Sequence, residues 1–167
     1  MKESDYLRDS KKIIDKLKQI PTLCSFSEKE LHGALQLSKI RKYEPEELII
    51  EEGSYDQWVY FLVSGKVRIV KQGKELSVLG RIGDVFGEMG VIDGSARSAS
   101  VYAVDQVVCL ACDASHADRL SGSDRLAFTC ILYQVFAELL ANRLRKTSEE
   151  LIKAEKEISS LKSRLNK

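Results

Sequence analysis

Hydrophobic and polar positions change their spacing twice along the chain, which divides it into three segments. In residues 1–37 the apolar positions include Ile13, Ile14 and Leu17, a rough helical stripe that Pro21 stops. The stretch SEKEL, which begins at Ser27, has the sequence of a capping box and predicts the start of a second short helix. We therefore expect residues 1–37 to form an N-terminal helical segment.

Short β-rich runs punctuated by glycine fill residues 38–122. Runs such as VYFLVSGKVRIV and SASVYAVDQVVCLACD are rich in β-branched and aromatic residues, and turn signals recur between them at short intervals, among them Gly53, Gly65 and Gly94. This spacing is typical of an antiparallel sandwich or roll and not of alternating strands and helices. The predicted fold class is α+β: an antiparallel, jelly-roll-like β-roll flanked by N-terminal helices and a long C-terminal helix.

The third segment, residues 123–167, has a seven-residue apolar repeat, and neither glycine nor proline occurs from Asp124 onward. With Leu144 at heptad position a, the same position holds Cys130, Ala137, Leu151, Ile158 and Leu165, and position d holds Tyr133, Leu140, Thr147, Ala154 and Leu161. Such a repeat predicts one long helix with a coiled-coil seam. A helix packed only on its own domain would explain residues 124–142 but not the later heptads, so we expect a homodimer through this helix.

Charge and hydropathy exclude several classes of protein. The chain has 26 basic and 25 acidic residues, and residues 21–142 hold 12 basic and 17 acidic ones. A net-acidic body argues against general nucleic-acid binding, which requires a track of Lys and Arg. No apolar run approaches the roughly 20 residues of a membrane span, and the N-terminus is too charged for a secretion signal. We expect a cytoplasmic protein without a membrane partner.

Cysteine and histidine offer little chemistry in this sequence. Cys109 and Cys112 form a C-x-x-C, but they lie in an apolar strand where their side chains point to opposite faces, which favours core packing over a zinc site. His32 and His116 are isolated and are interpreted as surface residues. Because no metal set, nucleophile elbow or nearby general base is visible, we expect no catalytic residues and no enzyme activity.

The stretch FGEMGVIDGSARSASV, residues 86–101, contains the most informative pair of charges. Glu88 and Arg97 flank an apolar, glycine-rich run. An exposed ion pair contributes only about 0 to 1 kcal/mol and would not require an apolar segment between its two residues. The segment can fold back through a short helical turn at GEMGVI and a reversal at DGS, with Gly94 at positive φ. It then offers a guanidinium, backbone donors, the Ser98 hydroxyl and one carboxylate, which suit a phosphate plus a sugar hydroxyl.

These residues resemble the phosphate-binding cassette of cyclic nucleotide-binding domains. The family pattern is roughly F-G-E-hydrophobic, an intervening run, then R-small-A-small-hydrophobic. The resemblance implies that Arg97 binds the exocyclic oxygens of the cyclic phosphate and that Glu88 accepts a hydrogen bond from the ribose 2′-hydroxyl. It also implies that Ser98 and the amides of Gly87 and Ala99 supply further donors.

The resemblance extends over residues 20 to about 125. Met89 stands at the hydrophobic position of the cassette and is included among the expected ligand-binding residues. Ala96 stands where many members carry proline, a difference that loosens the turn without removing a contact. The stretches IPTLCSFSEKEL and GRIGDVFGE are similar to the helical entry and to the approach to the cassette.

The sequence ANRLRKTSEEL resembles the dimerisation helix of bacterial cAMP receptor proteins. The resemblance implies that Thr147 contacts adenine within its own subunit and that Ser148 contacts the adenine of the partner subunit. Arg143 would face the same pocket, or else be a solvated surface charge. A threonine at position d also has a simpler interpretation as a polar residue kept for register. A hydroxyl can donate or accept, so cAMP is favoured on the helix match and cGMP remains possible.

The expected function is a cyclic nucleotide-binding regulatory domain that couples its ligand to the dimer helix. It needs no prosthetic group and no metal. Bacterial receptors of the family continue into a helix-turn-helix domain, whereas here the sequence ends at Lys167. We therefore expect no direct DNA binding, and either a stand-alone sensor that recruits a protein effector or the regulatory part of a longer protein. The alternative is a constitutive dimerisation scaffold with a vestigial cassette.

Overall fold

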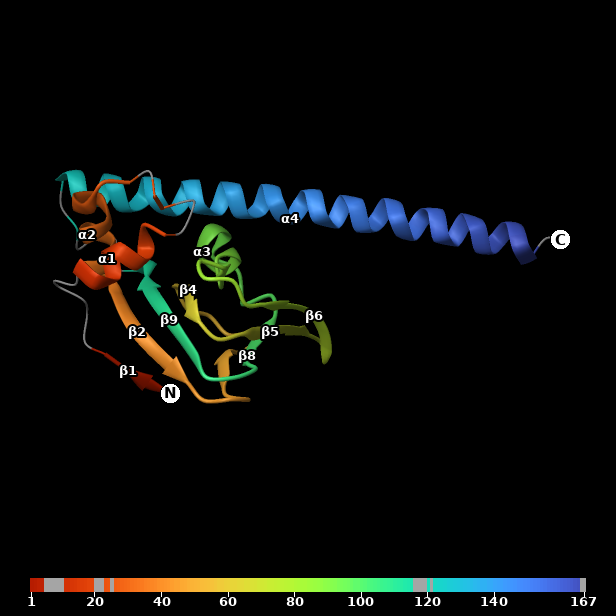
Figure 1. Ribbon diagram of the computed structural model, residues 1–167, viewed down its shortest axis with the longest axis horizontal. Coiled ribbons are helices and arrows are strands. Elements are labelled where there is room, and N and C mark those ends of the chain that lie inside the picture. The colour runs from red at the N-terminus through yellow and green to blue at the C-terminus, as the bar shows by residue number, and fades with distance from the viewer. Residues whose placement is uncertain (5–10, 20–22, 25, 116–119, 121, 166–167) are drawn as a thin grey trace.

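The computed structural model describes residues 1–4, 11–19, 23–24, 26–115, 120 and 122–165. Within these residues, a β-roll carries a small group of helices at one end, and one long helix runs across the roll and continues past it (Figure 1). This arrangement confirms the predicted fold class.

Two antiparallel sheets make up the roll. The first has the strand order β1-β2-β9-β4-β7, and the second has the order β3-β8-β5-β6. The strands are β1 Lys2–Glu3, β2 Ser38–Tyr43, β3 Leu48–Ile50, β4 Trp58–Ser64, β5 Val67–Lys71, β6 Lys74–Leu79, β7 Val85–Phe86, β8 Ser100–Ala103 and β9 Val107–Asp113. Each sheet pairs strands that are distant in sequence, such as Ile69 of β5 with Val101 of β8.

The five-stranded sheet is buried on both faces, which explains why its central strands are almost continuously apolar. In β4, Val59 and Phe61 point into a cluster with the helices, whereas Tyr60 and Leu62 point into the space between the sheets. Strand β9 alternates in the same way. Its Cys109 lies between the sheets and Cys112 lies on the helical side, which confirms that these cysteines pack on opposite faces of one strand.

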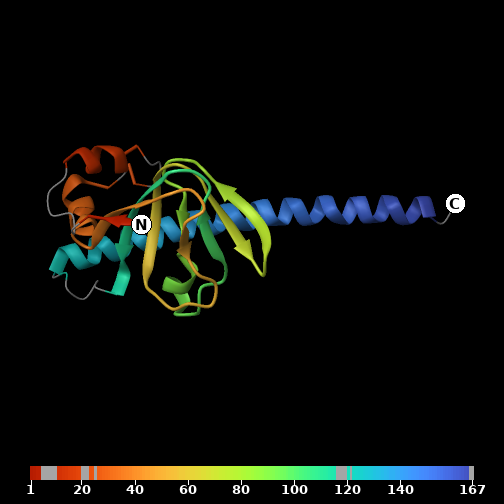
Figure 2. The ribbon, with the colours of Figure 1, turned by 90° about the horizontal axis from the view of Figure 1, so that it is seen from below.

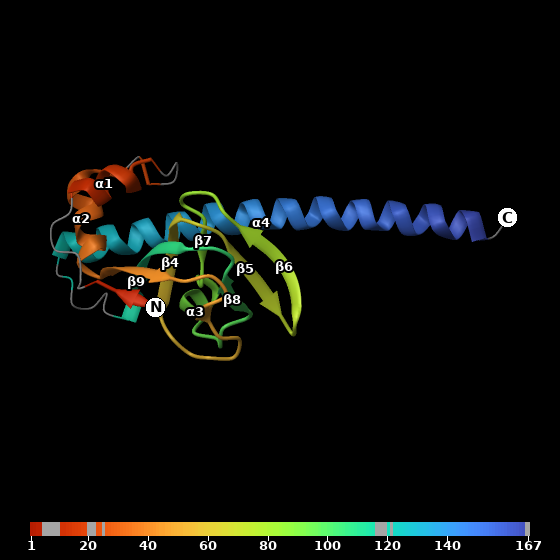
Figure 3. The same ribbon diagram turned by 60° about the horizontal axis from the view of Figure 1, so that its bottom comes forward.

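Three helices cover the outer face of this sheet: α1 Lys11–Leu17, α2 Glu28–Gln36 and the first part of α4 Gly122–Leu165 (Figure 3). The side of α4 that faces the core carries Phe128, Ile131, Leu132, Val135 and Phe136. These positions follow the i, i+3, i+4, i+7 spacing of a single helical face. Helix α2 starts directly after Ser27, as the capping sequence predicts, while Pro21 and His116 lie outside the described residues.

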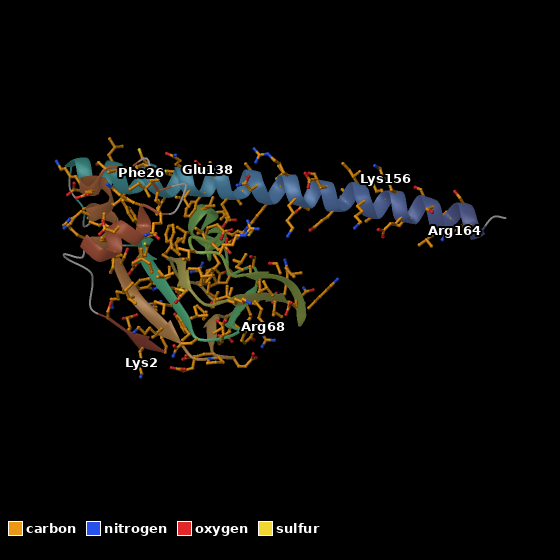
Figure 4. All side chains as sticks on the ribbon, in the orientation of Figure 1. Lys2, Phe26, Arg68, Glu138, Lys156 and Arg164 are labelled. Carbon is orange, nitrogen blue, oxygen red and sulfur yellow. The ribbon has the colours of Figure 1, made fainter. Side chains whose placement is uncertain are left out.

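The last third of α4 extends away from the roll, with none of the other described elements beside it (Figures 1 and 2). Figure 4 shows the side chains of this part, including Lys156 and Arg164, projecting around the helix, whereas those of the roll crowd into its interior. The prediction of one long helix is therefore confirmed. Among the described residues, no helix has both the length and the apolar character needed to cross a membrane.

Candidate ligand-binding site

The segment between β7 and β8 folds back on itself as its sequence predicts. Gly87 has φ +79°, the short helix α3 Met89–Asp93 follows, and Gly94 ends it with φ 69° in the left-handed region. A Cβ at Gly87 would lie 3.0 Å from both the Trp58 carbonyl oxygen and Nη1 of Arg97. Glycine is therefore required there by backbone conformation and by close approach together.

Arg97 is nearly fully buried, with 3 % of its surface exposed, and its guanidinium is held on three sides. Nε donates to Oδ2 of Asp56 at 3.1 Å, and Nη2 donates to the Trp58 carbonyl at 2.6 Å and to Oδ1 of Asp56. Nη1 donates to the carbonyl of Gly87. Four of the five N–H donors of an arginine are thus engaged, and the orientation of the guanidinium is fixed.

Glu88 is equally buried, at 2 % exposure, and its partner comes from the long helix. Nη1 of Arg143 donates to Oε1 of Glu88, and Nη2 of Arg143 donates to the Val85 carbonyl at 2.9 Å. Glu88 and Arg97 therefore have separate partners: Glu88 pairs with Arg143, and Arg97 pairs with Asp56. A single residue of α4, Arg143, joins the helix both to β7 and to the cassette.

A cavity of about 590 Å³ opens between this segment, strand β6 and helix α4. Most of the residues expected from the sequence to bind ligand line it, namely Gly87, Glu88, Met89, Arg97, Ser98, Ala99, Arg143 and Thr147. Ser148 does not line it; its hydroxyl donates to the Leu144 carbonyl at 2.8 Å. The structure thus brings together two sequence segments some fifty residues apart.

The walls of the cavity divide into a charged and an apolar part. Apolar side chains come from the two sheets and α4, among them Ile50, Ile69, Leu76, Val78, Leu79, Val101 and Leu139. Near the cassette, hydrogen bonds from Ser95 hold the pKa of the Asp93 carboxyl below its ordinary value. Among the described residues, no group of three or more His, Cys, Asp or Glu side chains is placed to hold a metal ion. The arrangement suits a ligand with one anionic group and one flat, largely apolar group.

Several lining or supporting residues were missed by the sequence reasoning. Lys146 and Glu150 line the cavity, and their spacing from Arg143 is a signal that places them on the same face of the helix. Lys71, at the end of β5, lines it as well. Asp56 supports Arg97 from a loop 41 residues earlier, and no local pattern marks it.

A buried glutamate and a buried arginine stand on either side of the short helix α3, and the long helix α4 crosses the β-roll beside them. The family model for the cyclic nucleotide-binding domain matches residues 40–124. The chain belongs to the cyclic nucleotide-binding domain family.

Individual relatives agree with this assignment. The chain is 34 % identical over 143 residues to a cyclic AMP receptor protein of Thermus thermophilus, covering 81 % of this chain and 62 % of that protein. It is 32 % identical over 84 residues to a cGMP-dependent protein kinase of Eimeria tenella, covering 50 % of this chain and 8 % of the kinase.

Among solved structures, a cyclic nucleotide-binding domain from Methylobacillus flagellatus superposes with a TM-score of 0.70 at 19 % identity, covering 84 % of this chain and 80 % of that one. At this identity the likeness supports the fold alone. The chain spans less than two thirds of the length of the two named sequence relatives, which are named for different nucleotides.

Proposed function

We propose that this protein is a cyclic nucleotide sensor, with cAMP as its favoured ligand, that couples binding to its C-terminal helix in a homodimer. The observation that carries the proposal is the contact between Arg143 of α4 and Glu88 of the cassette at the wall of one cavity. A ligand that donates to Glu88 binds directly beside the Arg143 contact and so changes the surroundings of this residue of α4. The domain acts by binding and not by catalysis.

The phosphate of the ligand pairs with Arg97. Because four of its donors are already engaged, two contacts to phosphate require at least one present partner to be released. Asp56 is the partner best able to accept this change, since its side chain is 33 % exposed and water can solvate it. Ser98 and the amides of Gly87 and Ala99 add donors around the same group.

The ribose engages Glu88 through its 2′-hydroxyl, in competition with Arg143. A ribose hydroxyl shared with this carboxylate weakens the hold of Arg143 on Glu88 and on the Val85 carbonyl, and the position of α4 on the roll changes with it. The ligand shifts the position of α4 only by its differential affinity for the two arrangements. This coupling is the proposed signal to a protein effector.

The base lies against α4, where Thr147 lines the cavity. The Thr147 hydroxyl accepts from the 6-amino group of adenine, and Ser148, which does not line the cavity of its own chain, serves the site of the second subunit. The preference for cAMP rests on this pair and on the cAMP receptor among the relatives. A hydroxyl is also compatible with guanine, so cGMP is the second ligand to test.

The dimer rests on the exposed seam of α4. Six large side chains at positions a and d are all more than one third exposed in the single chain: Tyr133 66 %, Leu140 38 %, Leu144 68 %, Leu151 58 %, Ile158 51 % and Leu161 57 %. A stripe of this kind along a helix that leaves its own domain is what a parallel coiled coil buries. We place the protein in the cytoplasm, consistent with its cysteines, which form no disulfide among the described residues.

Isothermal titration calorimetry of the whole chain with cAMP, cGMP and linear 5′-AMP tests the proposal. Saturable binding of cAMP at one site per chain, tighter than cGMP and much tighter than 5′-AMP, is expected. The absence of heat and of any thermal shift at millimolar cyclic nucleotide would contradict it and favour a constitutive scaffold.

A further inference from the structure

Two charged residues at the far end of the cavity have no role in the cassette. Lys146 and Glu150 lie on the side of α4 that lines the cavity, one and two turns beyond Arg143, and their Nζ and Oε1 atoms are 3.8 Å apart. Both side chains are about two thirds or more exposed, so their ion pair contributes little to folding. Stability does not explain why a charged pair faces this cavity.

The coiled-coil seam does not explain Glu150 either. With Leu144 at position a, Glu150 falls at position g and would face position e of a second parallel copy, which is Glu155. Two carboxylates in that place repel one another. Glu157 and Lys162, one heptad later, form the favourable g–e pair that a parallel dimer prefers. The position of Glu150 is therefore better accounted for by the cavity than by the dimer.

The cavity runs along α4 from the cassette to β6, the strand that lies beneath the helix on the side toward its C-terminus (Figure 1). A phosphate at Arg97 and a ribose at Glu88 occupy the cassette end, so the base extends toward β6. Helical rise places Lys146 about 4.5 Å and Glu150 about 10 Å along the axis from Arg143. This is the stretch of helix that the base of the ligand faces.

We infer that Lys146 and Glu150 read the edge of the purine base, an assignment that rests on the proposed function. The Hoogsteen edge of adenine presents one acceptor, N7, beside one donor, the 6-amino group. Lys146 donates to N7, and the acceptor-only carboxylate of Glu150 takes one hydrogen of the 6-amino group. The second amino hydrogen remains for Thr147, which is three residues before Glu150 on the same face.

Guanine fits this pair less well along the same edge, because N7 and O6 are both acceptors and O6 would meet a carboxylate. Guanine can hydrogen-bond to Glu150 only by turning its N1–H and 2-amino groups toward the carboxylate. Lys146 and Glu150 therefore favour adenine over guanine through the 6-amino group. The contribution of Glu150 to this binding preference can be measured.

Double-mutant cycles between protein and ligand test the assignment on the 167-residue chain. Calorimetry compares cAMP with purine riboside 3′,5′-cyclic monophosphate, which lacks the 6-amino group, and with 7-deaza-cAMP, which lacks N7. The variants are Glu150→Ala and Lys146→Ala. The matched controls are Glu149→Ala and Lys153→Ala, which change exposed residues of the same helix outside the cavity.

The parent chain is expected to bind cAMP at least about fivefold tighter than the analogue without the amino group, the lower end of a base-edge contact at an exposed site. Glu150→Ala should reduce this ratio to the part that Thr147 alone contributes and Glu149→Ala should keep it in full, while Lys146→Ala should abolish the preference for cAMP over 7-deaza-cAMP. A ratio that is the same in Glu150→Ala and in Glu149→Ala, or a parent chain that prefers cGMP, overturns the assignment while cyclic nucleotide binding stands. A parent chain that binds no cyclic nucleotide overturns the proposed function as well.

Discussion

Replacing Arg97 by lysine separates the charge at the phosphate site from the geometry of its donors. The guanidinium donates to Asp56, to the Trp58 carbonyl and to the Gly87 carbonyl at once. An ammonium retains the positive charge and the attraction to Asp56, but it cannot span all three acceptors or offer a planar fork to phosphate. Arg97→Lys therefore keeps the charge of the site and loses its preorganisation.

The expected loss has two parts. Exchanging a bidentate charge-assisted contact for a single one should cost about 1.5 to 3 kcal/mol of binding free energy, roughly 10- to 150-fold in Kd. A carbonyl left without its donor should lower the free energy of unfolding by about 1 to 3 kcal/mol.

Calorimetry with cAMP measures the first part and urea denaturation the second, with circular dichroism checking that the variant is folded. Arg81→Lys, on the exposed turn before β7, is the matched control and should change neither quantity. A folded Arg97→Lys chain that binds cAMP within about twofold of the parent, a change near 0.4 kcal/mol, would refute the phosphate assignment.

Three further predictions concern the ribose, the seam and the thiols. Glu88→Gln removes the charge that accepts the ribose hydroxyl, so calorimetry should find cAMP binding weakened by about tenfold and 2′-deoxy-cAMP affected less, and equal losses for both ligands would argue against a contact to that hydroxyl. Leu144→Glu buries like charges in the seam and should give a monomer by analytical ultracentrifugation, whereas Lys153→Glu, outside the seam, should remain dimeric; a dimeric Leu144→Glu chain would exclude this interface. Burial raises the pKa of Cys109 and of Cys112 to about 12 each, so at pH 8 both stay protonated and shielded, and Ellman's reagent should label the exposed Cys24 but neither Cys109 nor Cys112 until urea is added.

The sequence predicts those features of this protein that local patterns encode. The turn at GEMGVI, the left-handed Gly94 and the long helix follow from glycine placement and apolar periodicity, and the structure has all three. The apolar runs at β4 and β9 predict strands because a sheet buried on both faces needs no polar alternation.

The partners of the two buried charges were not predictable in the same way. Asp56 meets Arg97 across 41 residues, and Arg143 meets Glu88 across 55, so both contacts depend on how the roll closes and where α4 crosses it. Lys146 and Glu150 are an intermediate case. Their helical spacing places them with Arg143, but only the packed structure shows that this face of the helix closes a cavity.

Hydrogen exchange of the whole chain with and without saturating cAMP tests the central claim most directly, namely that one nucleotide bridges the cassette and the helix. The account predicts increased protection of amides in residues 85–99 together with a changed exchange rate in residues 139–150. The changes should appear with the same dependence on cAMP concentration. Protection confined to residues 85–99, with exchange in α4 unaltered at saturation, would contradict it.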